Sequence, residues 1–357
     1  MNDIKEHIRF WAFLAAALLL AACTADDPSA ESGNGKSEVH LMPYMQSFHD
    51  VDPTTRRALP TGYTSFNPTN VMQMEVYLAH DEQITTSTLT NFPKQKVWNS
   101  SYDIVANKEY KIYGFMPRKI GSDHSATYQP NGIDLTLNNL PPFTDKDLCV
   151  ITGVLQGSKG GDISTSDIVL GKFNYTGKSA EDGNYIYLLL DHIYASLEFQ
   201  FKVDAEYAKL RIIKLKEVKL TTQVTTASVT LNIRENNEGK NPITNEMTWT
   251  PTSGTSEYTV YSSDNSDGTV LTTSYEHLAT AQFAPVSGAD NMTMTCTYNV
   301  YTADGNTLVG NRTAVNNLSS IVGLTSGRKR KIKISVEPTY LYILADPDLD
   351  NPTITID

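Results

Sequence analysis

Apolar and polar residues alternate with a period of two along most of the chain, and a helical period is nearly absent. The clearest runs have apolar residues at Leu197, Phe199, Phe201 and Val203, at Met292, Met294, Cys296, Tyr298 and Val300, and at Val229, Leu231 and Ile233. Because successive side chains of a strand point to opposite faces, each run predicts a strand with one face in a core and one in water. The pattern therefore predicts an all-β protein.

Clusters of Gly, Asn, Asp, Pro and Ser separate these runs, and Asp304-Gly305 indicates a hairpin turn. Many short strands joined by turns favour β-sandwiches, and the length fits two sandwich domains in tandem better than one. The turn-rich stretch 177–184 is the expected boundary. We therefore expect an N-terminal β-sandwich over 58–184 and a C-terminal β-sandwich over 185–357.

The N-terminus has the order of a secretory signal, with Lys5 and Arg9 ahead of an apolar run. That run ends at Ala22, which makes it shorter than the roughly 20 residues of a transmembrane helix. Leu20-Ala21-Ala22-Cys23 resembles the bacterial lipobox, which implies cleavage of a signal peptide at 1–22 and a lipid on Cys23. The alternative is that Cys23 is an ordinary apolar residue of the signal. Polar residues follow to Lys36 and are typical of a tether.

Composition and motifs argue against several classes of function. Cys149 and Cys296 lie in apolar runs and do not indicate a disulfide, and the net charge of -11 argues against a nucleic acid partner. The seven histidines lack metal-binding spacing, and no G-x-S-x-G motif is present. We therefore expect no catalytic residue, no metal site and no cofactor.

The acidic run from Asp346 to Asp350 offers oxygen ligands but lacks the pattern of a calcium loop. His192, between two apolar runs, is interpreted as a hydrogen-bonded structural residue.

A weakly alternating segment follows the tether, with Val39, Leu41 and Met45 among its apolar residues. It precedes Arg56-Arg57-Ala58, which lies among Asp, Thr and Pro residues and predicts an exposed loop open to a trypsin-like protease. Cleavage after Arg57 is favoured over cleavage after Arg56. The alternative is that the two arginines only form a solvated loop.

The lipobox, tether, first strand and arginine followed by Ala-Leu together resemble the fimbrillin family, the subunits of type V pili. Two further segments share that resemblance, Tyr110 to Pro117 and Asp191 to Phe199. The resemblance implies two transthyretin-like Greek-key domains and an outer membrane lipoprotein precursor. It also implies that an arginine-specific protease removes residues 23–57, after which the subunit joins a cell-surface fimbrium as a stalk or tip component.

In this family the vacated groove of one subunit accepts an extended segment of its neighbour, so contacts between subunits run head to tail. The resemblance implies that the C-terminal tail is the donor, with apolar positions at Tyr340, Tyr342, Ile343, Leu344, Ile354 and Ile356. The alternative function is a monomeric surface lipoprotein that keeps its first strand and binds glycans or other ligands through aromatic loops. An enzyme is the third and least favoured class.

Overall fold

The computed structural model describes residues 36–50, 62–66, 70–91, 97–157, 163–235, 247–286, 291–318, 325–340 and 347–356. Most of them lie in strands, so the predicted all-β class is confirmed. The helical segments in these ranges are two short 3-10 turns, η1 (Thr165–Asp167) and η2 (Tyr207–Lys209). Within the same ranges, no helix has the length and apolar character to cross a membrane.

The described strands form three sheets of nine, six and seven strands. The nine-stranded sheet contains β1 (Lys36–Gln46), β3 (Tyr63–Ser65), β4 (Met72–His80), β5 (Gln83–Asn91), β6 (Trp98–Val105), β7 (Glu109–Met116), β11 (Cys149–Gln156), β12 (Asn174–Thr176) and β13 (Asn184–His192). The six-stranded sheet contains β2 (His49–Asp50), β10 (Phe143–Thr144), β14 (Ala195–Val203), β18 (Glu276–Phe283), β21 (Arg328–Tyr340) and β22 (Pro347–Ile356). The seven-stranded sheet contains β8 (Asp123–Gln129), β9 (Gly132–Leu140), β15 (Arg211–Arg234), β16 (Met247–Ser262), β17 (Thr269–Val270), β19 (Thr293–Thr302) and β20 (Leu308–Asn317).

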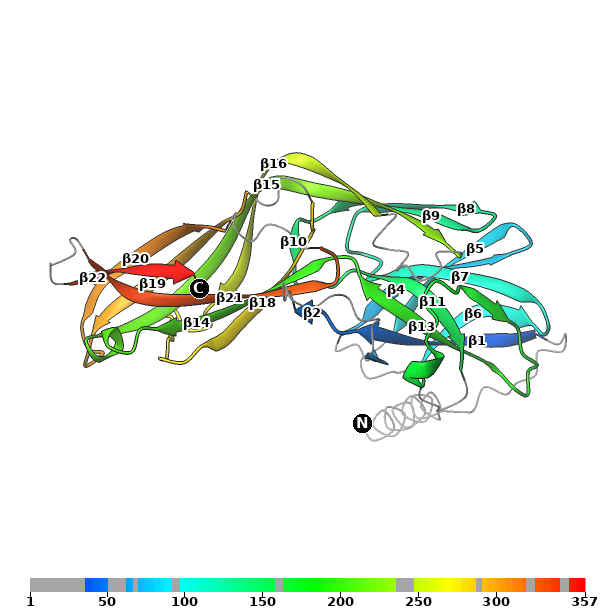
Figure 1. The fold of residues 1–357 in the computed structure, drawn as a ribbon, viewed down its shortest axis with the longest axis horizontal. Helices are drawn as coiled ribbons and strands as arrows, with labels where there is room; N and C mark the ends of the chain where they lie inside the picture. The colour runs from blue at the N-terminus through cyan, green and yellow to red at the C-terminus, as the bar shows by residue number, and fades with distance from the viewer. Residues whose placement is uncertain are drawn as a thin grey trace, which may run out of the picture.

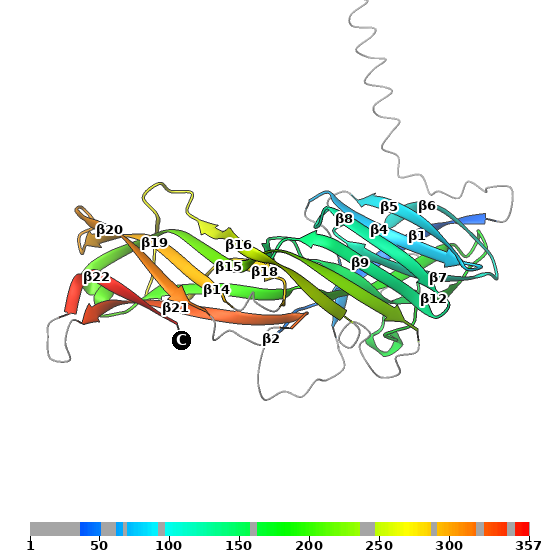
Figure 2. The same ribbon diagram turned by 90° about the horizontal axis from the view of Figure 1, so that it is seen from above.

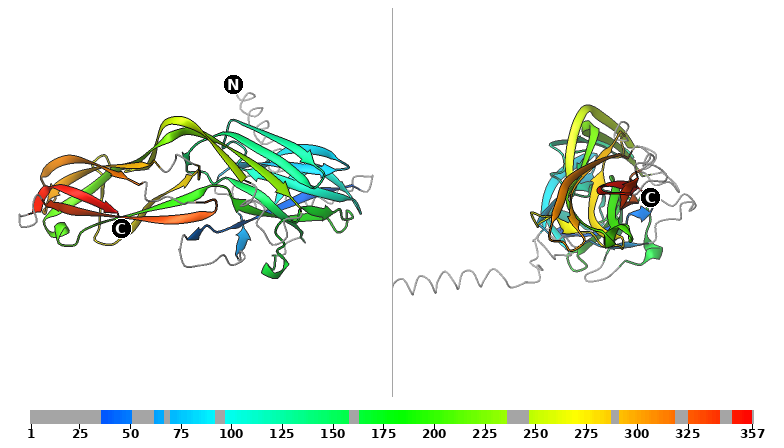
Figure 3. Two further views of the ribbon diagram at one scale, coloured as in Figure 1. Left: turned by 45° about the horizontal axis from the view of Figure 1, so that its top comes forward. Right: turned by 90° about the vertical axis from the view of Figure 1, so that its left-hand side faces the viewer.

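The molecule is elongated, with the nine-stranded sheet towards one end and β19 to β22 at the other (Figures 1 and 2). The antiparallel strands β15 and β16 pass over the middle of the molecule and extend towards both ends, as the left view of Figure 3 shows. The first part of β15 pairs with β19 up to Thr221, and its last part, from Ala227, pairs with β9. One strand is therefore shared by the two ends of the molecule.

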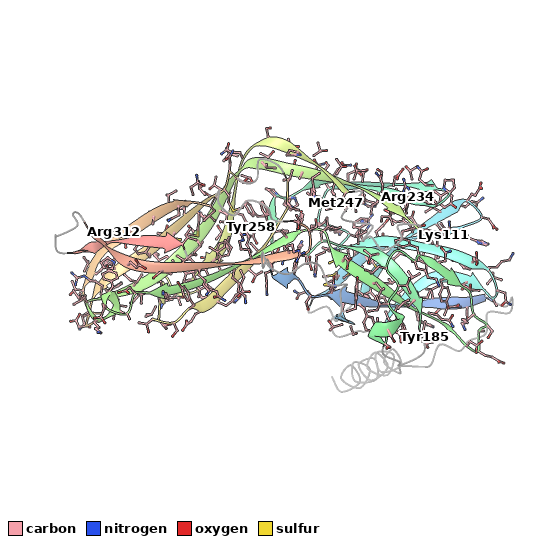
Figure 4. All side chains as sticks on the ribbon, viewed as in Figure 1. Lys111, Tyr185, Arg234, Met247, Tyr258 and Arg312 are labelled. Atoms are coloured by element: carbon pink, nitrogen blue, oxygen red, sulfur yellow. The ribbon has the colours of Figure 1, made fainter. Side chains whose placement is uncertain are left out.

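One ion pair joins the far end of β15 to the nine-stranded sheet: Lys111 Nζ of β7 lies 3.4 Å from Oε1 of Glu235, the residue after β15. Arg234 pairs with Asp134 of β9 within the seven-stranded sheet. Figure 4 labels Lys111 and Arg234 close together in this region, while Tyr258 of β16 lies near the middle of the molecule.

The core follows the alternation of the sequence. In β14 the residues Leu197, Phe199, Phe201 and Val203 are buried, and the residues between them are partly exposed. In β19 Met294, Cys296 and Tyr298 are buried in the same way. Cys149 and Cys296 are both buried free thiols.

The expected boundary at 184/185 coincides with the first residues of β13. That strand pairs with β1 and β11, so it lies in the nine-stranded sheet. The change to the six-stranded sheet comes with β14, which starts at Ala195. The domain bounds themselves stay a prediction.

Candidate functional site

The strand predicted to be removable, β1, lies inside the nine-stranded sheet. It pairs in parallel with β13, from Val39 opposite Asn184 to Met45 opposite Leu190. On its other edge it pairs antiparallel with β6 in its first half and with β3 at its end. Because β1 and β13 lie far apart in sequence, no local turn holds them together, and the contact depends on the pairing and packing themselves.

Both faces of β1 are buried, which is unusual for a strand near a sheet edge. Val39 and Leu41 lie in the main core, with exposed fractions of 1% and 0%. Met42 and Tyr44 face a second apolar cluster, where the ring of Tyr44 meets that of Tyr187 edge-on at 5.2 Å. Full burial of an apolar side chain contributes about 1.5–3 kcal/mol. Loss of β1 would therefore expose two apolar surfaces and one edge of β13.

The short strand β2 continues this segment into the six-stranded sheet. It pairs in parallel with the start of β21, His49 opposite Arg328 and Asp50 opposite Lys329. One edge of β21 is occupied by β14. The other edge is shared by β2 at its start and by β22, which pairs with β21 from Ile334 onwards. Residues 36–50 thus cover edges of two sheets at once.

The link between β1 and β2 is held by His192 at the end of β13. Its Nε2 lies 2.5 Å from the carbonyl oxygen of Gln46, and its Nδ1 lies 2.7 Å from Asp147 Oδ2. The ring of Phe48 stacks on the imidazole with centroids 3.7 Å apart. His192 is 6% exposed, so the interpretation of this residue as a hydrogen-bonded structural histidine agrees with its contacts.

The surroundings of His192 favour its charged form. Burial lowers the pKa of His192, but the hydrogen bond and negative charge of Asp147, the carbonyl of Gln46 and the charge of Asp191 outweigh it. The pKa is therefore raised above the usual value for histidine. Asp191 in turn accepts a hydrogen bond of 2.5 Å from the hydroxyl of Tyr63, and burial followed by the charge of Asp191 raises the pKa of that tyrosine.

One group of side chains in the described part of the chain has the composition of a metal site. It consists of Asp147, Cys149 and His192, whose ligand atoms lie within 4.8 Å of one another. Cys149 Sγ lies 3.6 Å from His192 Nδ1, and burial followed by the charge of Asp147 raises the pKa of the thiol. A cation here would have to displace the proton between His192 and Asp147 and ionise a buried thiol. The geometry fits a hydrogen-bonded cluster better than a metal site. The sequence does not indicate the cluster because its members follow no local spacing.

A cavity of about 620 Å³ opens beside this cluster. It is lined by Met45, Gln46, Ser47, Phe48, Thr64, Ser65, Phe66, Asp147, His192, Ser196, Glu198, Thr280, Gln282 and Lys329. The lining comes from β1, β3, β14, β18 and β21, so the cavity lies where the nine- and six-stranded sheets meet. Within the described residues, Nε2 of Gln46, Oδ1 of Asp147 and Oε1 of Gln282 are buried and have no hydrogen-bond partner.

Several predicted site residues lie outside the described ranges. These are Cys23, Arg56, Arg57, Ala58, Tyr342, Ile343 and Leu344. Tyr340 is the last residue of β21, and its strand pairs with β22 at that point. In β22, Ile354 is buried and Ile356 is 37% exposed. The structure therefore brings Val39, Leu41 and Met45 together with β13, whereas it pairs the tail with its own β21.

No protein-family model matches the chain, and no curated protein matches it either. Solved structures with a similar trace include a protein from Bacteroides uniformis provisionally described as a cell adhesion protein, a fimbrial protein from Bacteroides vulgatus, and the fimbrial anchor protein Mfa2 from Porphyromonas gingivalis. Their TM-scores are 0.45, 0.38 and 0.32, and their sequence identities are 13%, 12% and 11%. The alignments cover 92%, 90% and 90% of this chain and 99%, 98% and 97% of those chains. The fimbrillin family remains a resemblance at these scores.

Proposed function

We propose that this chain is a structural subunit of a cell-surface pilus that polymerises by exchange of strands and supports adhesion. The observation that carries the proposal is the placement of β1. It is an N-terminal strand with both faces buried, parallel to β13, and in sequence it is followed by Arg56-Arg57. One cut at this dipeptide separates a complete strand from the rest of the chain.

In this proposal the chain is exported with a lipid on Cys23, which anchors the precursor in the outer membrane. An arginine-specific protease then cuts after Arg57, or after Arg56. Residues 23–57 leave with β1 and β2, and the subunit joins a fimbrium at the cell surface. The lipid is therefore an anchor for export and is not part of the assembled fibre.

Departure of residues 23–57 would free the edge of β13 over 184–190 and the edge of β21 over 328–329, next to the stretch 330–333 that β22 does not pair. An extended segment from a neighbouring subunit can bind there, because main-chain hydrogen bonds supply affinity and alternating side chains fix the register. Since donor and acceptor are different surfaces, the contact does not close on itself and extends into a fibre.

The sequence of the tail supports its role as donor. Residues 44–52 read Tyr-Met-Gln-Ser-Phe-His-Asp-Val-Asp, and residues 342–350 read Tyr-Ile-Leu-Ala-Asp-Pro-Asp-Leu-Asp. Both segments begin with a tyrosine and an apolar residue and end with Asp-apolar-Asp at the same spacing. A tail bound in this register would place Tyr342 where Tyr44 meets Tyr187. It would also place Asp348 opposite Lys329, where Asp50 pairs now.

Treatment of the purified chain with an arginine-specific protease tests the proposal. We expect a new N-terminus at Ala58, loss of residues 23–57 and a ladder of oligomers that resists mild denaturant. The double variant Arg56→Ala/Arg57→Ala should stay a full-length monomer. Arg312→Ala, at an arginine on β20, is the matched control and should be cut and assemble like the unmodified chain. A chain that is cut at Ala58 yet stays monomeric would contradict the proposal.

A cysteine pair tests the register. With Tyr342→Cys and Tyr187→Cys in one chain, oligomers should form a disulfide between neighbouring subunits, because Tyr187 lines the place of Tyr44. The control Ile343→Cys/Tyr187→Cys puts the thiol on the opposite face of the donor strand and should not cross-link. Equal cross-linking of both pairs would reject this register.

A second candidate function is a monomeric surface lipoprotein that binds glycans or other polar ligands. The cavity beside His192 favours it, because Phe48 and Phe66 line it together with buried polar atoms of Gln46 and Gln282 that lack partners in the described structure. A glycan screen on the uncut chain separates the two candidates. Binding that is lost in Gln282→Leu, with no oligomers after protease treatment, would favour this second function.

A further inference from the structure

Two contacts join His192 to the end of β1 and the link that follows it, and a third joins it to Asp147. Its Nε2–H donates to the carbonyl oxygen of Gln46 at 2.5 Å, its ring stacks on Phe48, and its Nδ1–H donates to Asp147 Oδ2 at 2.7 Å. Gln46 and Phe48 belong to the part that the proposed cleavage would release, whereas His192 and Asp147 stay with the subunit. His192 thus connects the departing segment to what remains.

Both ring nitrogens of His192 face oxygen acceptors, and only the imidazolium carries a proton on each. A neutral ring protonated on Nε2 would point its Nδ1 lone pair at the Asp147 carboxylate. A neutral ring protonated on Nδ1 would point its Nε2 lone pair at the Gln46 carbonyl. Either neutral form therefore replaces one hydrogen bond with a repulsion in a buried place.

The charged and titratable groups around the ring come from every neighbouring element. They are Asp147 before β11, Cys149 on β11, Asp191 on β13, Tyr63 on β3, and Glu198 on β14 with Lys329 on β21 across the cavity. Lys329 Nζ lies 3.6 Å from Glu198, so its charge is offset by that carboxylate. Negative groups therefore dominate the surroundings of His192.

We propose that the His192 imidazolium, held by Asp147, is a positioning group that retains residues 46–48, so that proton loss from His192 allows the cut segment to leave. This inference rests on the proposed function, because it assumes that residues 23–57 are the part that departs. It adds that cleavage alone does not release the strand: acid holds the segment in place, and neutral to alkaline solution lets it go.

The direction of the pH effect follows from linkage between protonation and binding. With the segment present, the pKa of His192 is raised by Asp147 and the Gln46 carbonyl; without it, the carbonyl contact is gone. Retention is therefore full below the pKa of the vacated site and is lost as the pH rises through the higher pKa of the occupied site. Between these two values affinity should fall up to about tenfold per pH unit.

The experiment uses the full chain cut by an arginine-specific protease, with a fluorophore on the segment, in buffers with EDTA. The rate at which the segment leaves is followed by fluorescence anisotropy from pH 5 to pH 9. We expect slow release at pH 5 and release at least tenfold faster at pH 9. His192→Gln should leave fast at pH 5 and show a flat profile, and Asp147→Asn should shift the profile to lower pH.

The matched control is His277→Gln. His277 lies exposed on β18 and its Nε2 bonds to the Thr280 hydroxyl, so its loss should leave the profile unchanged. A flat profile in the unmodified chain, or an unchanged profile in His192→Gln, would overturn the inference. If the segment leaves at no pH, the proposed strand exchange fails instead.

A second measurement decides the charge of His192 without any release step. Nitrogen chemical shifts of labelled histidine in the uncut chain should show both ring nitrogens of His192 protonated at pH 7. Hydrogen exchange at residues 46–48, corrected for intrinsic rates, should show less protection at pH 9 than at pH 6. A neutral His192 ring at pH 6 would reject the proposed retention of residues 46–48 by His192, even if strand exchange itself takes place.

Discussion

The first and last described strands, β1 and β22, are held in different ways. β1 is paired on both sides and buries side chains on both faces, with Leu41 fully buried. In the described structure β22 pairs with β21 alone, with one further hydrogen bond of 2.9 Å from Asn316 Nδ2 to Ile354 O. β22 is also close in sequence to its partner, whereas β1 is not. We therefore expect β22 to detach more easily than β1, as the proposed donor role requires.

The largest expected effect comes from removing each strand. A chain that begins at Ala58 lacks β1 with Val39, Leu41, Met42 and Tyr44, at about 1.5–3 kcal/mol for each side chain. Since folded domains are stable by about 5–15 kcal/mol, we expect this chain to be largely unfolded at 25 °C. A chain that ends before β22 should lose only about 1.5–3 kcal/mol, from Ile354.

Urea unfolding of both truncated chains measures this difference. A synthetic peptide of residues 36–50 should restore the chain that begins at Ala58, because it refills both apolar surfaces and both sheet edges. A peptide with Leu41→Asp is the control and should not restore it. Equal loss of stability in the two truncations would remove the contrast between β1 and β22.

A smaller effect is expected for single residues of the same two strands. Leu41→Ala should lower the free energy of unfolding by about 2–5 kcal/mol, because it leaves a cavity in a fully buried place. Ile356→Ala, at a residue that is 37% exposed, should change it by about 0.5 kcal/mol. Denaturant midpoints at constant slope give both values. A loss at Ile356 as large as that at Leu41 would mean that the tail is held as firmly as β1.

The smallest effect concerns a partly exposed charge cluster in the seven-stranded sheet. Asp267 pairs with Lys214 and accepts hydrogen bonds from Tyr301 and from Asn299 at 3.1 Å, and the Lys214 contact is the main cause of its lowered pKa. Such a group stabilises the fold above its ordinary pKa and stops doing so as the pH falls through the lowered value. Asp267→Asn should therefore lower the melting temperature slightly at pH 7 and leave it unchanged below pH 2.

Melting temperatures of His192→Gln, measured over the same range of pH, should depend on pH in the opposite direction. The raised pKa of His192 stabilises the fold below the ordinary histidine pKa, and this contribution fades as the pH rises through the raised value. The stability contribution of His192 thus fades as the pH rises, whereas that of Asp267 fades as the pH falls. Identical pH profiles for the two variants would show that neither shift arises from its local partners.

The alternating runs were enough to predict the strands and their buried faces, since Leu197, Phe199 and Phe201 need only their own neighbours in sequence to show the pattern. The extent of β15 was not predictable in the same way. The runs that end near Leu220 and begin at Val229 read as separate strands, but one strand passes through both. The polar residues between them hide it, because pairing with β16 holds the backbone there.

The strand β1 was also predicted from its own residues, but its partner was not. Nothing in the sequence places Leu41 against Ile186, or Gln46 against His192, because both pairs meet only through the folded sheet. Asp147 and Tyr63 join the cluster from two further segments. Local sequence thus predicts the strand, and only the tertiary structure shows which residues it contacts.

The shared strand β15 has a mechanical consequence. Its 24 residues span about 75 Å at the rise of an extended chain, and they pair with β19 at one end and β9 at the other. A pull along the long axis would load the backbone of β15 and would load its ladders in shear. The register shifts between Thr222 and Thr226 lie between the two paired parts, so this short stretch is where the strand would yield first.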